Sequence, residues 1–316
     1  MKKLKALLLT EGMHGMISQA EGLAKALKAE YSHKIVRLSF PWNLIPPKFT
    51  PISQIVLKDK IYMNNNDEIP DLIISCGRKS VIPSIFLKRR NSKIFTIHIQ
   101  DPKVSFKNFD AIVSPEHDNL KGDNIYTSKG AMHYITEQEI SKAKQYLVDK
   151  IKSEKIVSLI LGGPNKYYSF NSDQIINIFN QIKSIFVPEG YKVIVIPSMR
   201  TPKEVIDLAI REMGPCGHVV NKVDKQAYLS AYALANYVIV TCDSTSMISE
   251  AATSGKPIFV AHMKAKKNNY RFQRFFELFK QMGITRDLGD KVEYWTYNKH
   301  NEAQRIAIEI KKKIKN

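Results

Sequence analysis

The stretch that decides the fold runs from residue 238 to residue 260 and reads Val-Ile-Val-Thr-Cys-Asp-Ser-Thr-Ser-Met-Ile-Ser-Glu-Ala-Ala-Thr-Ser-Gly-Lys-Pro-Ile-Phe-Val. It opens with a β-branched run, turns at polar residues and continues as a helical pattern over residues 245–254. Gly255 and Pro257 end that pattern before a second apolar run. A strand, a turn, a helix and another strand in direct succession predict an alternating β/α protein with a parallel sheet.

The start of this helix offers hydrogen-bond donors. Ser244 or Thr245 can cap the helix by accepting a hydrogen bond from an N–H group further on. The remaining free N–H groups and the positive end of the helix dipole favour an anion, and ligands of open α/β sheets bind at the carboxyl ends of the strands. A phosphate at residues 243–246 is one interpretation. The other is that Asp243 and Ser244 only cap the helix while Glu250 is a solvated surface residue.

The chain has 316 residues, a length that favours two domains of about 150 residues each. No apolar run approaches the ~18–20 residues that span a bilayer, and residues 1–10 are interpreted as a first strand rather than a signal peptide. Its 3 cysteines are widely separated and have neither a disulfide nor a zinc-site spacing. We therefore expect a cytoplasmic protein, and leave peripheral contact with a membrane open.

The net charge is strongly positive. With 48 Lys and Arg against 30 Asp and Glu, the formal charge of +18 would attract nucleic acid, anionic lipid or acidic substrates. The lysines are spread over the whole chain together with many Asn and Ile, which favours a compositional origin in a genome of low GC content. One local concentration stands out as a candidate patch for an anionic surface or substrate: Lys264, Lys266, Lys267, Arg271 and Arg274.

A similar pattern of strand, glycine turn and helix stands near the N-terminus, where Gly12 and Gly15 do not complete a dinucleotide fingerprint. Later strands of this half also end in polar residues, as with Asp101, which is what a site at the carboxyl edge of a parallel sheet requires. The β/α rhythm restarts at Lys155. We therefore expect an N-terminal α/β domain over residues 1–150, a C-terminal α/β domain over 151–290, and a final helix within 291–316 that packs back on the first domain.

Several short motifs, in a fixed order, carry a resemblance to a known family. They are Glu11-Gly12-Met13-His14-Gly15-Met16, Ile99-Gln100-Asp101-Pro102, Leu161-Gly162-Gly163-Pro164-Asn165, Pro197-Ser198-Met199-Arg200-Thr201-Pro202 and the stretch from Thr241 to Ala251. The chain resembles the GT-B architecture of nucleotide-sugar glycosyltransferases and epimerases. Within that superfamily it is similar to the bacterial and plant mitochondrial-fission-factor family, named for elongated mitochondria. The fold class implied is α/β and GT-B-like, with two doubly wound parallel-sheet domains facing each other across a cleft.

The resemblance also implies roles for single residues. In such glycosyltransferases a glutamate at the position of Glu250 accepts hydrogen bonds from the ribose hydroxyls, and the preceding turn faces the diphosphate. Arg200 would pair with a phosphate oxygen. The residues assigned to substrate or nucleotide binding are Gly12, Gly15, Gly162, Gly163, Asn165, Arg200, Asp243, Ser244, Thr245, Ser246 and Glu250. The first-domain motif departs from the better-known Gly-Gly-x-Gly-His loop because a single glycine precedes Met13.

The sequence contains no Asp-x-Asp motif, so we expect no metal site, and charge on a leaving group would be neutralised by helix N-termini and Arg or Lys. His14 is the first candidate for a general base because the pKa of histidine lies near working pH, and Asp101 is the second. The alternative for His14 is a cap or surface residue. The chain has no G-x-S-x-G, P-loop or NAD motif, which disfavours acyl and hydride transfer.

Three hypotheses for the function follow. The first is a metal-independent glycosyltransferase or related nucleotide-sugar enzyme that uses a nucleoside diphosphate-sugar as its donor and needs no cofactor. The second comes from the resemblance: plant members are associated with recruiting a dynamin-like GTPase to mitochondria, so the fold could serve as a non-catalytic adaptor. The third is a charge-driven binder of nucleic acid or of an anionic membrane surface, and an acidic acceptor is a further possible partner. No specific nucleic acid is expected, because RNP, helix-turn-helix and zinc motifs are missing.

Overall fold

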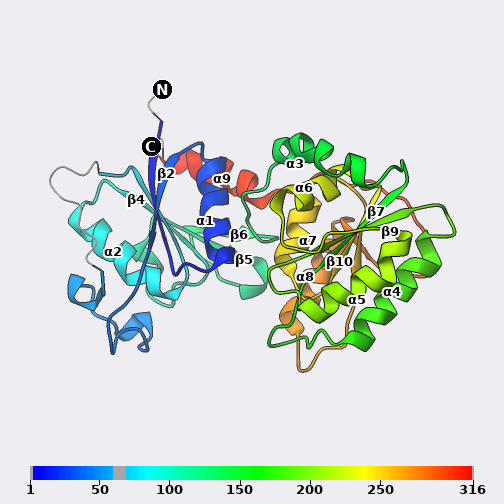
Figure 1. The fold of residues 1–316 in the computed structure, drawn as a ribbon. Coiled ribbons are helices and arrows are strands. Elements are labelled where there is room, and N and C mark those ends of the chain that lie inside the picture. Colours follow the sequence, from blue (N-terminus) through cyan, green and yellow to red (C-terminus); the bar gives the residue numbers. More distant parts are fainter. Residues whose placement is uncertain (1–2, 60–68, 315–316) are drawn as a thin grey trace. The chain divides into compact units, whose positions relative to one another are not determined.

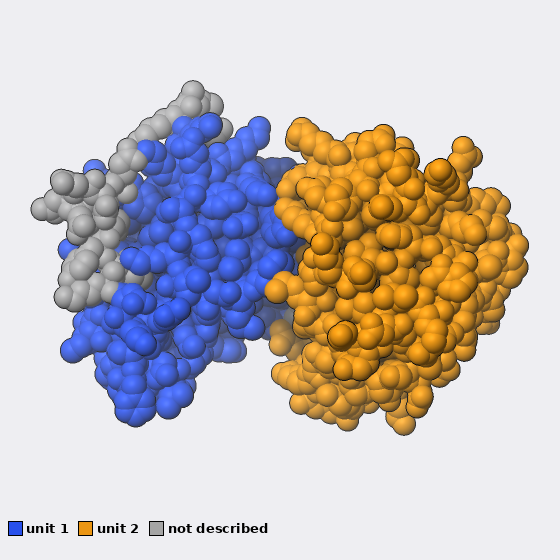
Figure 2. All heavy atoms as spheres, in the orientation of Figure 1, with its two compact units in different colours: residues 1–134, 301–316 blue, residues 135–300 orange. Residues whose placement is uncertain are grey.

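The computed structural model describes residues 3–59 and 69–314 and divides the chain into two compact units (Figures 1 and 2). The first unit comprises residues 1–134 and 301–316, and the second comprises residues 135–300. The first division thus lies after Tyr134 rather than near residue 150. The reason is that helix α3 (Glu137–Ala143) packs against α6 (Lys225–Leu234), while the backbone N–H of Leu147 donates to Ser230 Oγ at 3.1 Å.

The first unit is built on six parallel strands in the order β2-β1-β3-β4-β5-β6. Its elements are β1 (Lys5–Thr10), α1 (His14–Ala26), β2 (Glu30–Ile35), β3 (Leu72–Cys76), α2 (Val81–Arg90), β4 (Phe95–Ile99), β5 (Ala111–Pro115), β6 (Ile125–Ser128) and α9 (Glu302–Ile314). The chain crosses from β2 over β1 to β3, so the order reverses between β1 and β3. Polar residues that follow these two strands are therefore brought together at the carboxyl edge.

Alternate residues of these strands bury opposite faces of the sheet. Leu8 packs into a core shared with α1 and α9, whereas its neighbour Leu9 packs into the core on the α2 side. From α9, Ile306 and Ile310 are fully buried in the first of these cores. The helix also buries Glu302, whose Oε2 accepts a hydrogen bond from the backbone N–H of Lys129 at 2.8 Å. The end of the chain thus completes the first unit.

The second unit has six parallel strands in the order β12-β11-β10-β7-β8-β9. Its strands are β7 (Ile156–Leu161), β8 (Lys192–Pro197), β9 (Gly217–Val219), β10 (Tyr237–Thr241), β11 (Ile258–Ala261) and β12 (Thr285–Asp287), and its other helices are α4 (Ser172–Phe186), α5 (Lys203–Met213), α7 (Thr245–Ala252) and α8 (Tyr270–Gln281). Here the order reverses between β7 and β10. Both sheets are parallel, as the alternation of elements in the sequence predicted.

The phenylalanines of α8 form a core-facing stripe. Phe275, Phe276 and Phe279 are buried, and the Phe275 and Phe279 rings lie 4.2 Å apart. In the first unit, the chain between β2 and β3 includes two short 3₁₀ helices, η1 (Pro47–Phe49) and η2 (Gln54–Val56).

Candidate functional site

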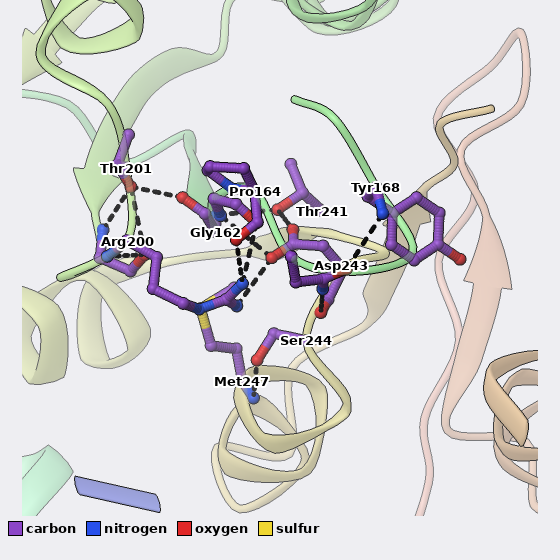
Figure 3. A network of polar contacts seen from close by, with 12 residues as sticks. Gly162, Pro164, Tyr168, Arg200, Thr201, Thr241, Asp243, Ser244 and Met247 are labelled. Atoms are coloured by element: carbon purple, nitrogen blue, oxygen red, sulfur yellow. Dashed lines mark hydrogen bonds and ion pairs between the residues drawn. The ribbon is translucent and has the colours of Figure 1, made fainter. Parts of the chain in front are cut away.

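A buried carboxylate organises the carboxyl ends of β7 and β10. Asp243 is 2% exposed and follows β10 directly (Figure 3). Its Oδ2 accepts hydrogen bonds from the Gly163 N–H at 3.0 Å and from Arg200 Nη2 at 2.8 Å, and its Oδ1 accepts one from Thr241 Oγ1 at 2.7 Å. Burial raises the pKa of Asp243, although the Gly163 N–H, the Arg200 charge and the hydroxyl of Thr241 act to lower it. The carboxylate therefore ties three strand ends together.

The two glycines after β7 are required by these protein contacts. A Cβ on Gly162 would lie 2.1 Å from Asp243 Oδ2, and a Cβ on Gly163 would lie 1.9 Å from the carbonyl oxygen of Arg200. Thr201 Oγ1 donates to the carbonyl of Gly162 at 2.5 Å, which fixes the turn from its other side. Both glycines are buried, so the turn supports the site instead of lying open beside it.

The guanidinium of Arg200 is already engaged by the protein. Its Nη1 donates to the Gly163 carbonyl at 2.8 Å and its Nη2 to Asp243, while the side chain remains 40% exposed. Asn165 holds the other flank, because its Nδ2 donates to the backbone oxygen of Asp243 at 3.0 Å and its Oδ1 accepts from the Tyr168 N–H at 3.0 Å. Arg200 and Asn165 thus set the shape of the turn, a use that the sequence did not indicate.

Helix α7 begins where the sequence placed its cap. Ser244 is the N-cap residue, as the sequence predicted, and its Oγ accepts a hydrogen bond from the Met247 N–H at 3.3 Å, whereas Asp243 does not cap the helix (Figure 3). Thr245 and Ser246 occupy the first turn and are partly exposed. In the described part of the chain, no acceptor takes a hydrogen bond from the backbone N–H groups of Thr245 and Ser246. These donors are available to an anion.

Glu250 lies on α7 beside two tyrosines. The Tyr228 hydroxyl donates to Glu250 Oε2 at 2.5 Å and receives a hydrogen bond from the Tyr232 hydroxyl at 2.7 Å. Burial raises the pKa of Glu250 to about 7, and the hydrogen bond from Tyr228 opposes that rise. Part of Glu250 still reaches solvent. Among the described residues, no donor is recorded for its Oε1, which leaves one carboxylate oxygen for a ligand.

The corresponding edge of the first unit is arranged differently. Gly12 has a positive φ of 86° and its N–H donates to Thr10 Oγ1 at 3.1 Å. His14 is the first residue of α1 and is exposed, as is Gly15. The N-cap residue Met13 supplies no side-chain hydrogen bond, so the first turn of α1 is open. The three predicted residues of this turn, Gly12, His14 and Gly15, thus lie at the carboxyl end of β1, as the sequence indicated.

Asp101 follows β4 at the same edge, but a neighbouring lysine occupies it. Asp101 Oδ1 accepts from the Lys103 N–H at 2.9 Å, and Oδ2 lies 2.5 Å from Lys103 Nζ. Partial burial favours a higher pKa for Asp101, but these contacts with Lys103 outweigh it and hold the pKa below its usual value. A carboxylate of lowered pKa is a weaker base, so His14 is the better placed of the two candidates.

Within residues 3–59 and 69–314, no group of three or more His, Cys, Asp or Glu side chains is placed to hold a metal ion. Cys76 and Cys242 are buried, and burial raises the pKa of the Cys76 thiol to about 12 and that of Cys242 to about 11. These two thiols therefore stay protonated and unreactive at neutral pH.

No helix in the described ranges is both long and apolar enough to cross a bilayer.

Sequence reasoning missed Tyr228, Tyr232, Thr201 and Thr241, all of which support the site. The only signal for the tyrosines was their i, i+4 spacing on α6, which places both hydroxyls on one helix face. The threonines gave no signal, because their contacts with the backbone of Gly162 join residues that are far apart in the sequence. Thr241 Oγ1, for example, accepts from the Gly162 N–H at 2.9 Å across 79 positions.

Two parallel sheets of these orders, with a glycine turn after the first strand of each unit, define a protein of the GT-B class. The fold is similar to that of a UDP-GlcNAc 2-epimerase from Methanocaldococcus jannaschii, with a TM-score of 0.57 and 13% identity over 98% of this chain and 99% of that one. At this identity the likeness shows the fold alone.

The chain belongs to the mitochondrial fission ELM1 family, whose family model matches residues 14–314. It is 25% identical to the uncharacterized protein RP120 of Rickettsia prowazekii (strain Madrid E), over 95% of this chain and 96% of that protein. It is also 24% identical to the mitochondrial fission protein ELM1 of Arabidopsis thaliana, over 78% of this chain and 64% of the plant protein. The chain thus spans less than two thirds of its plant relative.

Proposed function

We propose that this protein is a metal-independent nucleotide-sugar enzyme, a glycosyltransferase or a related enzyme that acts on a nucleoside diphosphate-sugar. One observation carries the proposal. Helix α7 presents unused N–H donors at Thr245 and Ser246 and, further along, a carboxylate at Glu250 with one oxygen free among the described residues. Donors for phosphate and an acceptor for hydroxyl groups on one short helix are what a nucleoside diphosphate requires.

In this proposal the second unit binds the nucleotide. The diphosphate lies against the first turn of α7 and the ribose hydroxyls donate to Glu250, whose orientation Tyr228 fixes. Gly162, Gly163 and Asp243 hold the turn in place without contacting the ligand, as Asn165 does. The exposed part of Arg200 faces the phosphates as a fixed positive charge, because its guanidinium is pinned by Asp243. The similarity in fold to a protein named as a UDP-GlcNAc 2-epimerase supports this assignment.

The proposed general base lies in the first unit. His14, on the open turn of α1 with Gly12 and Gly15, acts as general base, while Asp101 is held back by Lys103. Neither a metal nor an organic cofactor takes part. Affinity for a nucleoside diphosphate should then be the same in EDTA and in excess Mg²⁺, and a large loss in EDTA would contradict this part of the proposal.

The decisive experiment is calorimetric titration of the full chain with UDP and other nucleoside diphosphates. Glu250→Gln should weaken binding by about 10- to 150-fold, because a hydrogen bond to a charged acceptor is worth roughly 1.5–3 kcal/mol. Glu189→Gln is the matched control, since Glu189 is exposed just before β8, at the opposite edge of the sheet. Equal affinity in the Glu250 and Glu189 variants would refute the assignment.

His14→Ala separates binding from chemistry. It should leave nucleotide affinity unchanged and abolish hydrolysis or transfer of the sugar, which product analysis on the bound nucleotide-sugar measures. Loss of affinity without loss of turnover would contradict the role of His14 as general base.

A second candidate is a non-catalytic adaptor. The observation in its favour is that Asp243, Arg200 and Gly163 hydrogen-bond to one another without a ligand. The name of the Arabidopsis relative, a mitochondrial fission protein, points the same way. A folded chain that binds no nucleoside diphosphate in the titration would favour the adaptor over the enzyme.

A further inference from the structure

The segment between β2 and β3 of the first unit exposes large apolar side chains. Phe40 is 79% exposed, Leu44 70%, Phe49 69% and Ile55 75%. They lie on the loop and the two 3₁₀ turns drawn in medium blue in Figure 1, which stand away from the sheet at the lower left of this unit. Single exposed apolar residues are ordinary, but four within sixteen positions need a physical reason.

The segment is held firmly in this exposed position. Arg78 donates from Nη1 to the Ile45 carbonyl at 3.1 Å and from Nη2 to the Asn43 carbonyl at 2.6 Å. At the base of the segment, the Ser39 N–H donates to the Val56 carbonyl at 2.9 Å and Val56 is fully buried. The segment therefore does contain buried positions, such as that of Val56. These positions are filled by side chains other than the four exposed ones. The exposure of the apolar side chains is built into the fold.

The part of the segment that carries the four apolar tips is basic. Between β2 and Asp59 the charged side chains are Arg37, Lys48 and Lys58, all exposed, and Asp59 is the first acidic residue after them. Lys48 Nζ lies 5.8 Å from the centre of the Phe49 ring, so a cation accompanies one of the apolar tips. A segment that binds a membrane surface inserts apolar side chains into the acyl boundary, while cations beside them contact the anionic headgroups. Both features are present here.

We propose that residues 40–56 dock the protein on an anionic lipid bilayer, with Phe40, Leu44, Phe49 and Ile55 entering the headgroup and acyl boundary. A lipid surface suits the segment better than a protein groove, because Lys48 stands beside the Phe49 ring while Arg37 and Lys58 flank the tips in the sequence, and an anionic bilayer can meet all three cations. The inference does not rest on the proposed enzymatic function.

The experiment measures co-sedimentation of the full chain with vesicles of phosphatidylcholine alone and of an equal mixture with phosphatidylglycerol. We expect binding to the anionic vesicles only. Replacing Phe40, Leu44, Phe49 and Ile55 together by Ser should weaken that binding by roughly tenfold or more, since affinity scales with buried apolar area. Because all four side chains are exposed, the melting temperature should be unchanged, which keeps misfolding apart from loss of docking.

Two further measurements separate insertion from charge attraction alone. Trp42 lies within the segment and is partly exposed, whereas Trp295 is buried in the second unit and gives a constant background. Brominated acyl chains should therefore quench the fluorescence of Trp42 on binding. The matched charge variant, Lys264→Gln with Lys266→Gln and Lys267→Gln, removes three exposed cations of the second unit and should keep this quenching.

The proposal is overturned if the variant with four serines binds anionic vesicles as tightly as the original chain. Loss of all binding in the lysine variant, with no quenching of Trp42 in the original chain, would show attraction by charge alone. Sedimentation velocity gives the remaining outcome. If the original chain ignores vesicles but self-associates, and the variant with four serines is monomeric, the segment is a contact between copies and the lipid proposal is wrong.

Discussion

The two places where the strand order reverses differ in how firmly their turns are held together. Between β7 and β10 a buried carboxylate, Asp243, joins the turn after β7 to the helix after β10 and to Arg200. Between β1 and β3 fewer polar contacts join the turns. Glu11 accepts a hydrogen bond from the Lys79 N–H at 3.0 Å, and its other oxygen lies 3.5 Å from Lys79 Nζ. The comparison shows that a site can be fixed in shape at one edge and left open at another within one fold.

This difference matches the two tasks that we assign to the edges. A binding site gains from donors that need no rearrangement when the ligand arrives, and the locked second unit supplies them at the start of α7. A group that takes up a proton must be reached by substrate, and His14 stands on a turn without a side-chain cap. The following predictions, from the largest expected effect to the smallest, can break or sharpen this comparison.

Gly163→Ala should be the most damaging change. The new methyl group would lie 1.9 Å from the Arg200 carbonyl oxygen, so the backbone of one turn or the other must move. We expect a loss of at least about 3 kcal/mol in the free energy of unfolding of the second unit. Denaturant unfolding followed by the fluorescence of the buried Trp295 measures it. A variant as stable as the original chain would show that the turn is not locked.

Asp243→Ala should destabilise the second unit by about 2–4 kcal/mol, because it leaves a buried N–H at Gly163 unpaired and frees Arg200 from its partner. The partial exposure of Arg200 keeps the loss below that of a fully buried pair. Glu11→Ala in the first unit is the comparison, with an expected loss of about 1 kcal/mol. Equal losses in the two variants would remove the distinction between a locked and an open edge.

Glu250→Gln should change how stability depends on pH. The folded-state pKa of about 7 lies above the unfolded value near 4.3, so the folded state holds the proton more tightly and stability is lost as pH rises between those values. The glutamine variant lacks this loss. Relative to the original chain it should gain roughly 1–2 kcal/mol between pH 5 and pH 8, a figure discounted because Glu250 reaches solvent.

Melting curves of both proteins at pH 5 and pH 8 test this, and the control is Glu189→Gln, which should follow the original chain at both pH values. The same titration predicts that a nucleoside diphosphate binds more weakly at pH 6 than at pH 8, since hydroxyl groups donate to the ionised carboxylate. Parallel pH profiles for all three proteins would place the titrating group elsewhere.

Gly15→Ala should have the smallest effect and the opposite sign. No atom lies within 4 Å of the added methyl group, and alanine favours the helix that begins at His14. We expect a gain of up to about 0.5 kcal/mol in the stability of the first unit, reduced because Gly15 is near the helix end. Chemical denaturation followed by Trp42 fluorescence measures it. A marked loss would mean that the first turn of α1 is as crowded as the turn at Gly163.

Much of the fold was predictable because it rests on local patterns. The apolar runs and the turns between them fixed the parallel sheets, and Ser244 marked the start of α7. The division between the two units lies after Tyr134 and not near residue 150, because α3 gives no sign in the sequence that its partner is α6. Its apolar positions Ile140 and Ala143 would suit either unit.

What the sequence by itself determined is therefore the order of elements, their amphipathic faces and the edge at which polar residues gather, all of which follow from spacings of a few residues. Only the tertiary structure decided what those polar residues do. Arg200 was expected to face phosphate, yet it meets Gly163 and Asp243, which lie 37 and 43 positions away. Glu250 gained its tyrosine partner across 22 positions. Such pairings depend on which strands become neighbours in the sheet, and local spacing carries no record of that order.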